Sequence, residues 1–145
     1  SYVLSSSDAD VTGGGTLYTL GASGNVLTKV FDQSDEVTTA GVFTPTVAGI
    51  YLLGCSIVFG NTSAIAAMDN YALSIVTTGQ NWAKYGNLQS EQALTSSLGV
   101  GMVRLSSLFQ MSASNTAKVT LQVWDSTDTL DIEAGNTTFY GYKVA

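Results

Sequence analysis

The 145-residue chain contains no histidine, one cysteine, one proline and few charged residues. Without histidine, the usual Ser-His-Asp and Cys-His catalytic arrangements are excluded, and so is a zinc site of the Cys/His kind. The single cysteine, Cys55, excludes an intrachain disulfide, so cysteine usage does not indicate a redox compartment. Because Cys55 lies within an apolar run, we expect it to be a small buried hydrophobic residue.

Charged residues make up 11% of the chain, against about 25% in an average soluble domain. The net charge is −6, which leaves no cationic surface for binding DNA or RNA. Apolar residues reach 45%, which excludes a disordered chain. The low charge content indicates that much of the surface is buried against other subunits, because the cores of protein interfaces are depleted in charge. The alternative is a monomeric sandwich with a surface rich in hydroxyl groups.

No apolar run is long enough to cross a membrane as a helix, which takes about 20 residues. The longest run, Ile50 to Phe59, is rich in β-branched and aromatic residues and follows Pro45 and Gly49, so we predict a strand. Both of its faces are mostly apolar, which predicts a central strand with one face on a second sheet and the other on a sheet or a neighbouring subunit. The segment Ser1–Ser7 lacks the basic and apolar parts of a signal peptide, and we expect no membrane insertion.

Helical periodicity is weak and turn signals recur along the chain, which predicts an all-β fold of about ten short antiparallel strands. We expect a jelly-roll β-sandwich that forms a single domain over residues 1–145. Loops are predicted at Asp8–Gly15, Asp32–Glu36 and Asp125–Asp131, and a bulge near Gly99 and Gly101, where the apolar pattern changes phase. The other predicted strands are 17–20, 26–31, 42–44, 70–77, 81–85, 94–111, 118–124 and 138–144.

Two segments, read together, resemble the signatures of a known family. Gly41 to Leu53 is similar to the pattern G-x-F-x-x-P-x-x-G-x-Y-x-F of the complement-q globular head, a branch of the tumour-necrosis-factor-like jelly rolls. The closing segment, Thr138 to Ala145, is similar to that family's last strand, s-x-F-x-G-[FY]-x-[LV]. The family's G-D-x-V turn is replaced here by Ser114–Val119, and no collagen-like stalk is present. The matching residues are Phe43, Gly49, Tyr51, Phe139, Gly141 and Tyr142, with Pro45 one place early.

This resemblance implies a ten-stranded jelly roll that packs as a compact homotrimer around a three-fold axis. It also implies a binding or assembly module rather than an enzyme. The low charge content points to subunit contacts by a separate route, so the two lines of reasoning agree.

Two sets of side chains are candidate sites. Asp125, Asp128 and Asp131 place three carboxylates in one loop, and Ca²⁺ can take such oxygen ligands in an irregular loop. The spacing differs from that of an EF-hand, and a solvated acidic turn is the alternative; no other cofactor is expected. Trp82 and Tyr85 lie in a predicted hairpin, where they could stack on a sugar ring, anchor a partner, or cover the end of the barrel.

Three functions are consistent with these features. The first is a non-enzymatic virion protein of a virus or phage: a trimeric fibre head, spike or capsid decoration protein at the particle surface. Its partners would be its own copies, other virion proteins, and a receptor or glycan on the host. The second is an extracellular, secreted complement-like or cytokine-like binding protein. The third, a carbohydrate-active enzyme, would need a carboxylate pair beside a sugar-binding groove, and nothing in the sequence indicates such a groove.

Overall fold

The computed structural model describes residues 1–22, 25–60, 70–88, 101–124 and 129–145. The elements that lie wholly within these residues are β-strands. They are β1 (Tyr2–Leu4), β2 (Asp8–Thr12), β3 (Leu17–Thr19), β4 (Leu27–Lys29), β5 (Gly49–Gly60), β6 (Asn70–Thr77), β7 (Asn81–Asn87), β8 (Gly101–Met111), β9 (Ala117–Trp124), β10 (Leu130–Ile132) and β11 (Thr138–Lys143).

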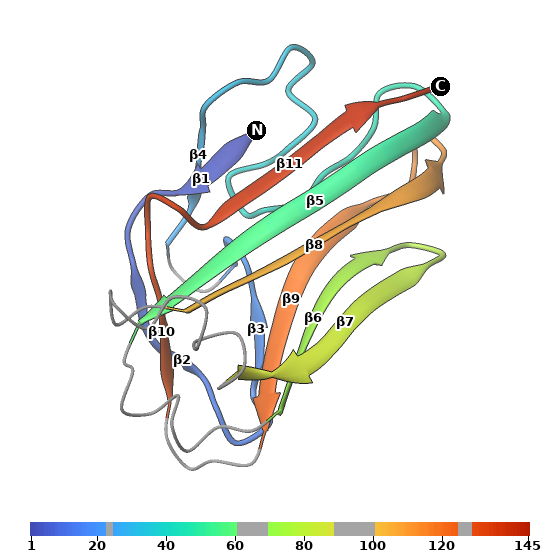
Figure 1. Cartoon of the computed structure of the whole chain (residues 1–145). Helices are drawn as coiled ribbons and strands as arrows, with labels where there is room; N and C mark the ends of the chain where they lie inside the picture. The colour runs from blue at the N-terminus through green and yellow to red at the C-terminus, as the bar shows by residue number, and fades with distance from the viewer. Residues whose placement is uncertain (23–24, 61–69, 89–100, 125–128) are drawn as a thin grey trace.

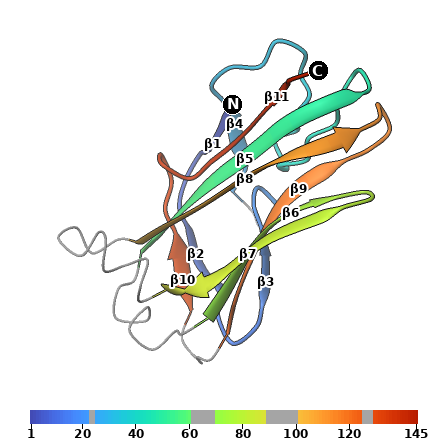
Figure 2. The same cartoon turned by 45° about the vertical axis from the view of Figure 1, so that its right-hand side comes forward.

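The strands form two antiparallel sheets packed as layers, which confirms the predicted all-β sandwich (Figure 1). The larger sheet has seven strands in the order β2-β10-β5-β11-β1-β4, and β8 pairs with the remaining edge of β5. The smaller sheet has four strands in the order β3-β9-β6-β7. Figure 2 shows the layer of β11, β5 and β8 beside the layer that contains β9, β6 and β7. Strand pairs far apart in the sequence therefore build both layers.

Strand β5 is the centre of the larger sheet, as its long apolar run predicts. β8 pairs with β5 along the whole of Gly49–Phe59 without a slip in register. On the opposite edge, β11 pairs with Tyr51–Ser56, and β10 continues that edge at Phe59 and Gly60. Because both edges are hydrogen-bonded, β5 has no unpaired stretch through which it could join another sheet.

The core lies between the inner faces of the two sheets. On β5 it takes up the alternate residues of the apolar run, as predicted, and each is at most 2% exposed. Full burial of such side chains contributes about 1.5–3 kcal/mol each, so this face supplies a large share of the stability. The buried residues at the centre are Tyr51, Leu53, Cys55, Ile57 and Phe59 of β5, Tyr71, Leu73 and Ile75 of β6, and Val119, Leu121 and Val123 of β9.

The prediction of a loop over Asp8–Gly15 is wrong for its first part, because Asp8–Thr12 forms strand β2 on the edge of β10. The polar composition of this segment is typical of a loop, so the sequence did not predict the strand. Asp8 is nevertheless buried, and its carboxylate accepts hydrogen bonds from Tyr18 Oη at 2.7 Å and Asn25 Nδ2 at 2.6 Å. Partners within the fold thus replace the water that a loop aspartate would have.

Three further boundaries differ from the predictions. Residues 42–44 do not form a strand, because only Phe43 makes ladder contacts, as isolated bridges to Val37 and Ala117. The predicted strand 26–31 shortens to β4, and β10 begins inside the predicted acidic loop, at Leu130. Strands of only three residues, such as β4 and β10, are too short to show a clear period, so their ends are hard to place from the sequence.

Strand β8 is regular from Gly101 to Met111. Val103, Leu105 and Phe109 point inward, which is the second of the two phases that the sequence shows. Residues 94–100 of the predicted strand, and with them the expected bulge near Gly99, lie outside the described residues.

Candidate interaction surface

Four of the six residues that carry the family resemblance pack in or next to the core: Phe43, Tyr51, Phe139 and Gly141. Phe43 packs edge-on against Tyr51, with ring centroids 5.4 Å apart and an interplanar angle of 64°. A Cβ on Gly141 would lie 2.6 Å from Cδ2 of Leu53, which would have to move, and 3.4 Å from Cε2 of Phe43, in close contact. Phe139 is fully buried opposite Cys55. These residues hold β5, β11 and the loop before β5 together, and their role is structural.

The remaining two signature residues, Gly49 and Tyr142, have different roles. The C-terminal segment crosses Gly49 so closely that a Cβ would overlap the Lys143 side chain and the carbonyl of Ala145. Tyr142 points away from the core and is 56% exposed. It lies on the outer face of the larger sheet, opposite Leu52.

That outer face is the largest exposed apolar feature of the three central strands. The register places alternate residues of β5, β8 and β11 on it, and Arg104 is the one charged residue among them. Ile50, Leu108 and Tyr142 are 41%, 59% and 56% exposed. The residues of this face are Ile50, Leu52, Gly54, Ser56 and Val58 of β5, Met102, Arg104, Ser106, Leu108 and Gln110 of β8, and Thr138, Tyr140 and Tyr142 of β11.

The expectation that both faces of β5 are covered holds within a single chain for the inner face and for part of the outer face. The smaller sheet closes the inner face. On the outer face Gly54, Ser56 and Val58 are buried, whereas Ile50 reaches solvent. An antiparallel sheet that faces water usually carries polar residues at alternate positions. Here those positions are mostly apolar, which is typical of a surface that contacts a partner.

Trp82 and Tyr85 do not form one stacking platform. Both belong to the edge strand β7 and are exposed, at 55% and 73%. Trp82 pairs with the inward-facing Ile75, whereas Tyr85 pairs with Ala72 on the outer side of the smaller sheet. Since successive side chains of a strand alternate between faces, these two aromatic rings point to opposite faces of β7. Each can contact a partner separately.

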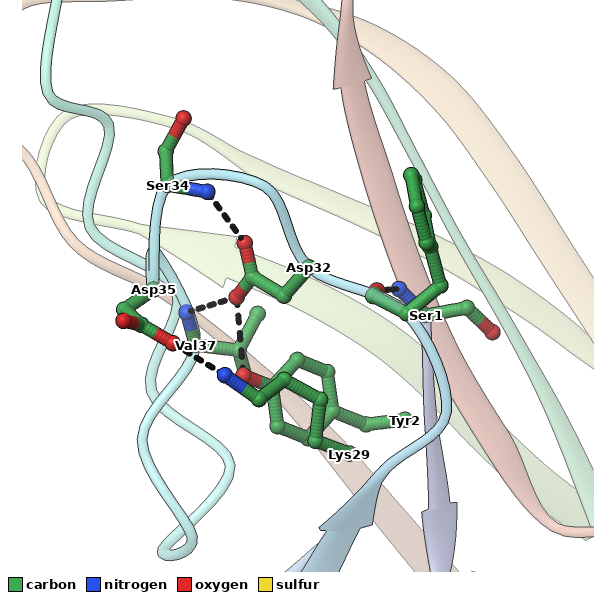
Figure 3. Close-up of polar contacts among 8 residues, drawn as sticks. Ser1, Tyr2, Lys29, Asp32, Ser34, Asp35 and Val37 are labelled. Carbon is green, nitrogen blue, oxygen red and sulfur yellow. Dashed lines mark hydrogen bonds and ion pairs between the residues drawn. The ribbon is translucent and has the colours of Figure 1, made fainter.

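The loop Asp32–Glu36 is organised by its first carboxylate (Figure 3). Asp32 accepts hydrogen bonds from Tyr2 Oη at 2.7 Å and from the backbone N–H groups of Ser34 at 3.0 Å and Val37 at 3.3 Å. Burial opposes ionisation, but these donors outweigh it and lower the pKa of Asp32. Burial, and then the bond to Asp32, raises the pKa of Tyr2 to about 12.

Asp32 and Glu36 also border a hollow of about 400 Å³. Both carboxylates are already engaged, because Glu36 Oε1 accepts bonds from the backbone N–H of Thr46 at 2.9 Å and from its hydroxyl at 3.0 Å. These acidic residues therefore order the loop and leave little capacity for a ligand.

The predicted calcium ligands Asp125 and Asp128 lie outside the described residues, so that site stays a prediction. Asp131 lies in β10, and its Oδ1 accepts a hydrogen bond from the backbone N–H of Asp10 at 2.9 Å. In the described part of the chain, no group of three or more acidic or cysteine side chains converges in a way that could hold a metal ion.

Cys55 is buried, as predicted, and burial raises the pKa of its thiol to about 12. A thiol in this environment stays protonated at neutral pH and is a poor nucleophile. Among the described residues, no helix has the length and apolar character of a membrane span.

No protein-family model matches the sequence, and no curated protein matches it either. The similarity to known proteins lies in the structure. The crystal structure of murine APRIL at pH 8.0 superposes with a TM-score of 0.61 at 10% identity, covering 99% of this chain and 95% of that one. The globular domain of zebrafish complement 1qA protein gives a TM-score of 0.51 at 11% identity, covering 100% and 98%.

The fold is the complement-q and tumour-necrosis-factor-like jelly roll. The structural similarity confirms the fold that the two signature segments implied. At these identities the likeness establishes the architecture and leaves the function to be argued from the surface.

The sequence did not predict which residues share the outer face of the larger sheet. Ser56, Arg104 and Thr138 are brought side by side by pairing between strands that are distant in the sequence. One signal was present: the outward positions of the apolar run are interrupted by two small residues, Gly54 and Ser56. That interruption coincides with a hollow in the face.

Proposed function

We propose that this chain is a non-enzymatic binding or assembly module that forms a homotrimer through the outer face of the larger sheet. The observation that carries the proposal is the exposed apolar character of that face, where Ile50, Leu108 and Tyr142 reach solvent beside a single charge, Arg104. The low charge content of the whole chain and the fold that it shares with APRIL and complement 1qA support the same conclusion.

A closed three-fold assembly uses two different patches on each copy, because its interface is heterologous. The outer face of the larger sheet is one candidate patch. The edge strand β7 is the other, since it presents Trp82 and Tyr85 to solvent, and aromatic residues are enriched in interfaces. A stable contact of this kind buries about 800 Å² on each partner.

Several observations favour a module without catalytic activity. The chain has no histidine, and the one thiol is buried with a pKa of about 12. The carboxylates of Asp8 and Asp32 accept hydrogen bonds from other parts of the chain and so stabilise the fold. A carbohydrate-active enzyme would need two free carboxylates across a groove, and the carboxylates described above do not make such a pair.

For the biological setting, we propose a trimeric head at the surface of a virus or phage particle, as fibre head, spike or capsid decoration. This rests on composition: few charges, no disulfide, and a surface rich in Ser, Thr, Asn and Gly. The second candidate is an extracellular binding protein like the complement and cytokine heads, which the fold favours. Mass spectrometry of purified particles distinguishes the two, because a virion protein is present in them in fixed proportion to the capsid.

The contact face is tested by Leu108→Asp, with Leu17→Asp as the matched control. Both leucines lie on strands and are similarly exposed, at 59% and 57%, but Leu17 lies on the smaller sheet. We expect Leu108→Asp to dissociate the assembly in sedimentation experiments and Leu17→Asp to leave it intact. Equal behaviour of the two variants would show that the outer face of the larger sheet is not the contact.

A further inference from the structure

The outer face of the larger sheet contains a pocket of about 730 Å³. Its floor is built by β5 and its sides by β8 and β11, so one chain forms it. It lies on the face that we propose as the trimer contact, and a ligand there would compete with a second copy of the chain. The volume falls in the range of about 300–1,000 Å³ that is usual for small-molecule sites. Six of the lining residues matter for its chemistry: Ser56, Val58, Met102, Arg104, Thr138 and Tyr140.

Polar groups run in a row across the floor. Ser56 lies between Arg104 of β8 and Thr138 of β11, each directly opposite it in the register. Directly opposed residues on one face of an antiparallel pair have Cβ atoms about 4.5–5.5 Å apart. One bound group can therefore reach all three side chains.

The unpaired hydroxyl of Ser56 favours a ligand at the floor of the pocket. The side chain of Ser56 is buried, with the residue 9% exposed, and its Oγ has no hydrogen-bond partner among the described residues. Buried hydroxyl groups in folded proteins are nearly always hydrogen-bonded, because an unpaired one keeps the full cost of losing water. Because this Oγ has almost no accessible area, a ligand acceptor reaches it only after the Ser56 side chain rotates toward the pocket, and such a contact would remove that cost.

Arg104 indicates the charge of the ligand. No salt bridge to its guanidinium is present among the described residues, although the chain carries a net charge of −6. A guanidinium group is a planar fork of donors that matches a carboxylate with two parallel hydrogen bonds. An anionic group would therefore sit between Arg104 and Ser56.

The rest of the pocket is partly apolar, with Ser106 and Asn136 as further polar residues. Val58 and Met102 line one part. On the other, the ring of Tyr140 lies over Gly54 so closely that a Cβ there would overlap its Cζ and Oη atoms. The absence of a side chain at Gly54 thus lets an aromatic ring form a wall of the pocket.

We propose that this pocket binds a small organic acid. The carboxylate accepts hydrogen bonds from Arg104 and from the Ser56 hydroxyl, and the apolar part of the acid packs against Met102, Val58 and the Tyr140 ring.

Sodium benzoate is a suitable probe, with benzamide as its neutral counterpart, and binding to the full chain can be followed by titration calorimetry. We expect saturable binding of benzoate and much weaker binding of benzamide. Arg104→Gln should weaken benzoate binding by about 10- to 100-fold, the worth of hydrogen bonds to a charged group. Lys118→Gln, which removes the same charge from the smaller sheet, should leave binding unchanged.

Ser56→Ala separates a ligand contact from a structural role. It should weaken benzoate binding by about 2- to 10-fold. At the same time it should leave the melting temperature of the ligand-free protein equal or higher, because no hydrogen bond within the chain is lost.

Absence of saturable benzoate binding at millimolar concentration would overturn the proposal. Equal binding of benzamide, or an equal loss in Lys118→Gln and Arg104→Gln, would overturn it too. If Arg104→Gln instead dissociates the assembly and benzoate does not bind, the carboxylate at this site belongs to a second copy of the chain. Sedimentation of the unmodified chain without benzoate tests the trimer by itself, so the failure of one proposal can be told from the failure of the other.

Discussion

Phe43 shows how a single side chain can tie a loop to the core without belonging to a strand. Its ring is 1% exposed and packs on Tyr51, and its backbone exchanges two hydrogen bonds of 2.9 Å with Ala117 of β9. The Tyr51 hydroxyl in turn donates to the carbonyl of Val47 at 2.6 Å. The loop before β5 is thereby fastened to both sheets.

Truncation of the buried aromatic residues should be severe. Tyr51→Ala and Phe139→Ala each remove a large side chain that is at most 1% exposed. We expect each to lower the free energy of unfolding by about 3–5 kcal/mol, measured by urea denaturation. Ile50→Ala, on the outer face of the same strand as Tyr51, is the control. When the protein is diluted so that it stays monomeric, this exposed substitution should change the free energy of unfolding by no more than about 0.5 kcal/mol. Wild-type stability of Tyr51→Ala would show that the inner face is assigned wrongly.

Gly41 is required by its backbone as well as by its surroundings. It has a φ of +73°, and a Cβ would overlap the carbonyl oxygen of Leu20. We expect Gly41→Ala to cost about 2 kcal/mol or more. Gly79 lies in a turn where a Cβ meets nothing within 4 Å, so Gly79→Ala should be nearly neutral. Thermal melting of the two variants side by side checks this, and a neutral Gly41→Ala would contradict the geometry.

At the scale of elements, the sequence predicts those strands whose apolar side chains repeat with a clear period. β5, β6 and β9 are of this kind, because the inner face of each is wholly buried. β2 is not, since its buried residues, Asp8 and Thr12, are both polar, and the partners of Asp8 are Tyr18 and Asn25 from elsewhere in the chain. The signature residues could be found from the sequence for the same reason, as local patterns. The pocket could not, because the neighbours of Ser56 are set by long-range strand pairing.

The loop Asp32–Glu36 should make stability depend on pH. The folded-state pKa of Asp32 is below its usual value, about 3.9 in an unfolded chain, so its contribution is present above about pH 4 and is lost as pH falls through the folded value. We expect Asp32→Asn to be less stable than wild type at pH 7, and this difference to narrow below about pH 4.

Asp35→Asn is the control for that experiment. Asp35 pairs with Lys29, but its side chain is 80% exposed, and exposed ion pairs contribute little. Asp35→Asn should have a small effect on the free energy of unfolding at every pH tested. A difference for Asp32→Asn that stays constant down to about pH 2 would contradict the assigned hydrogen bonds.

At the scale of the whole molecule, the inner face of the larger sheet is closed, whereas part of its outer face is exposed. The smaller sheet covers the inner face of β5, β8 and β11, and the outer face presents apolar side chains around Arg104. A chain with 11% charged residues has few means of keeping such a face in water. In the trimer that we propose, contact with further copies would cover it.

The proposed trimer is tested most directly by the mass of the unmodified protein in solution. Sedimentation equilibrium at micromolar concentration should give three times the chain mass of 15.1 kDa. A mass of one chain at that concentration would contradict the proposed assembly and the role assigned to the outer face of the larger sheet.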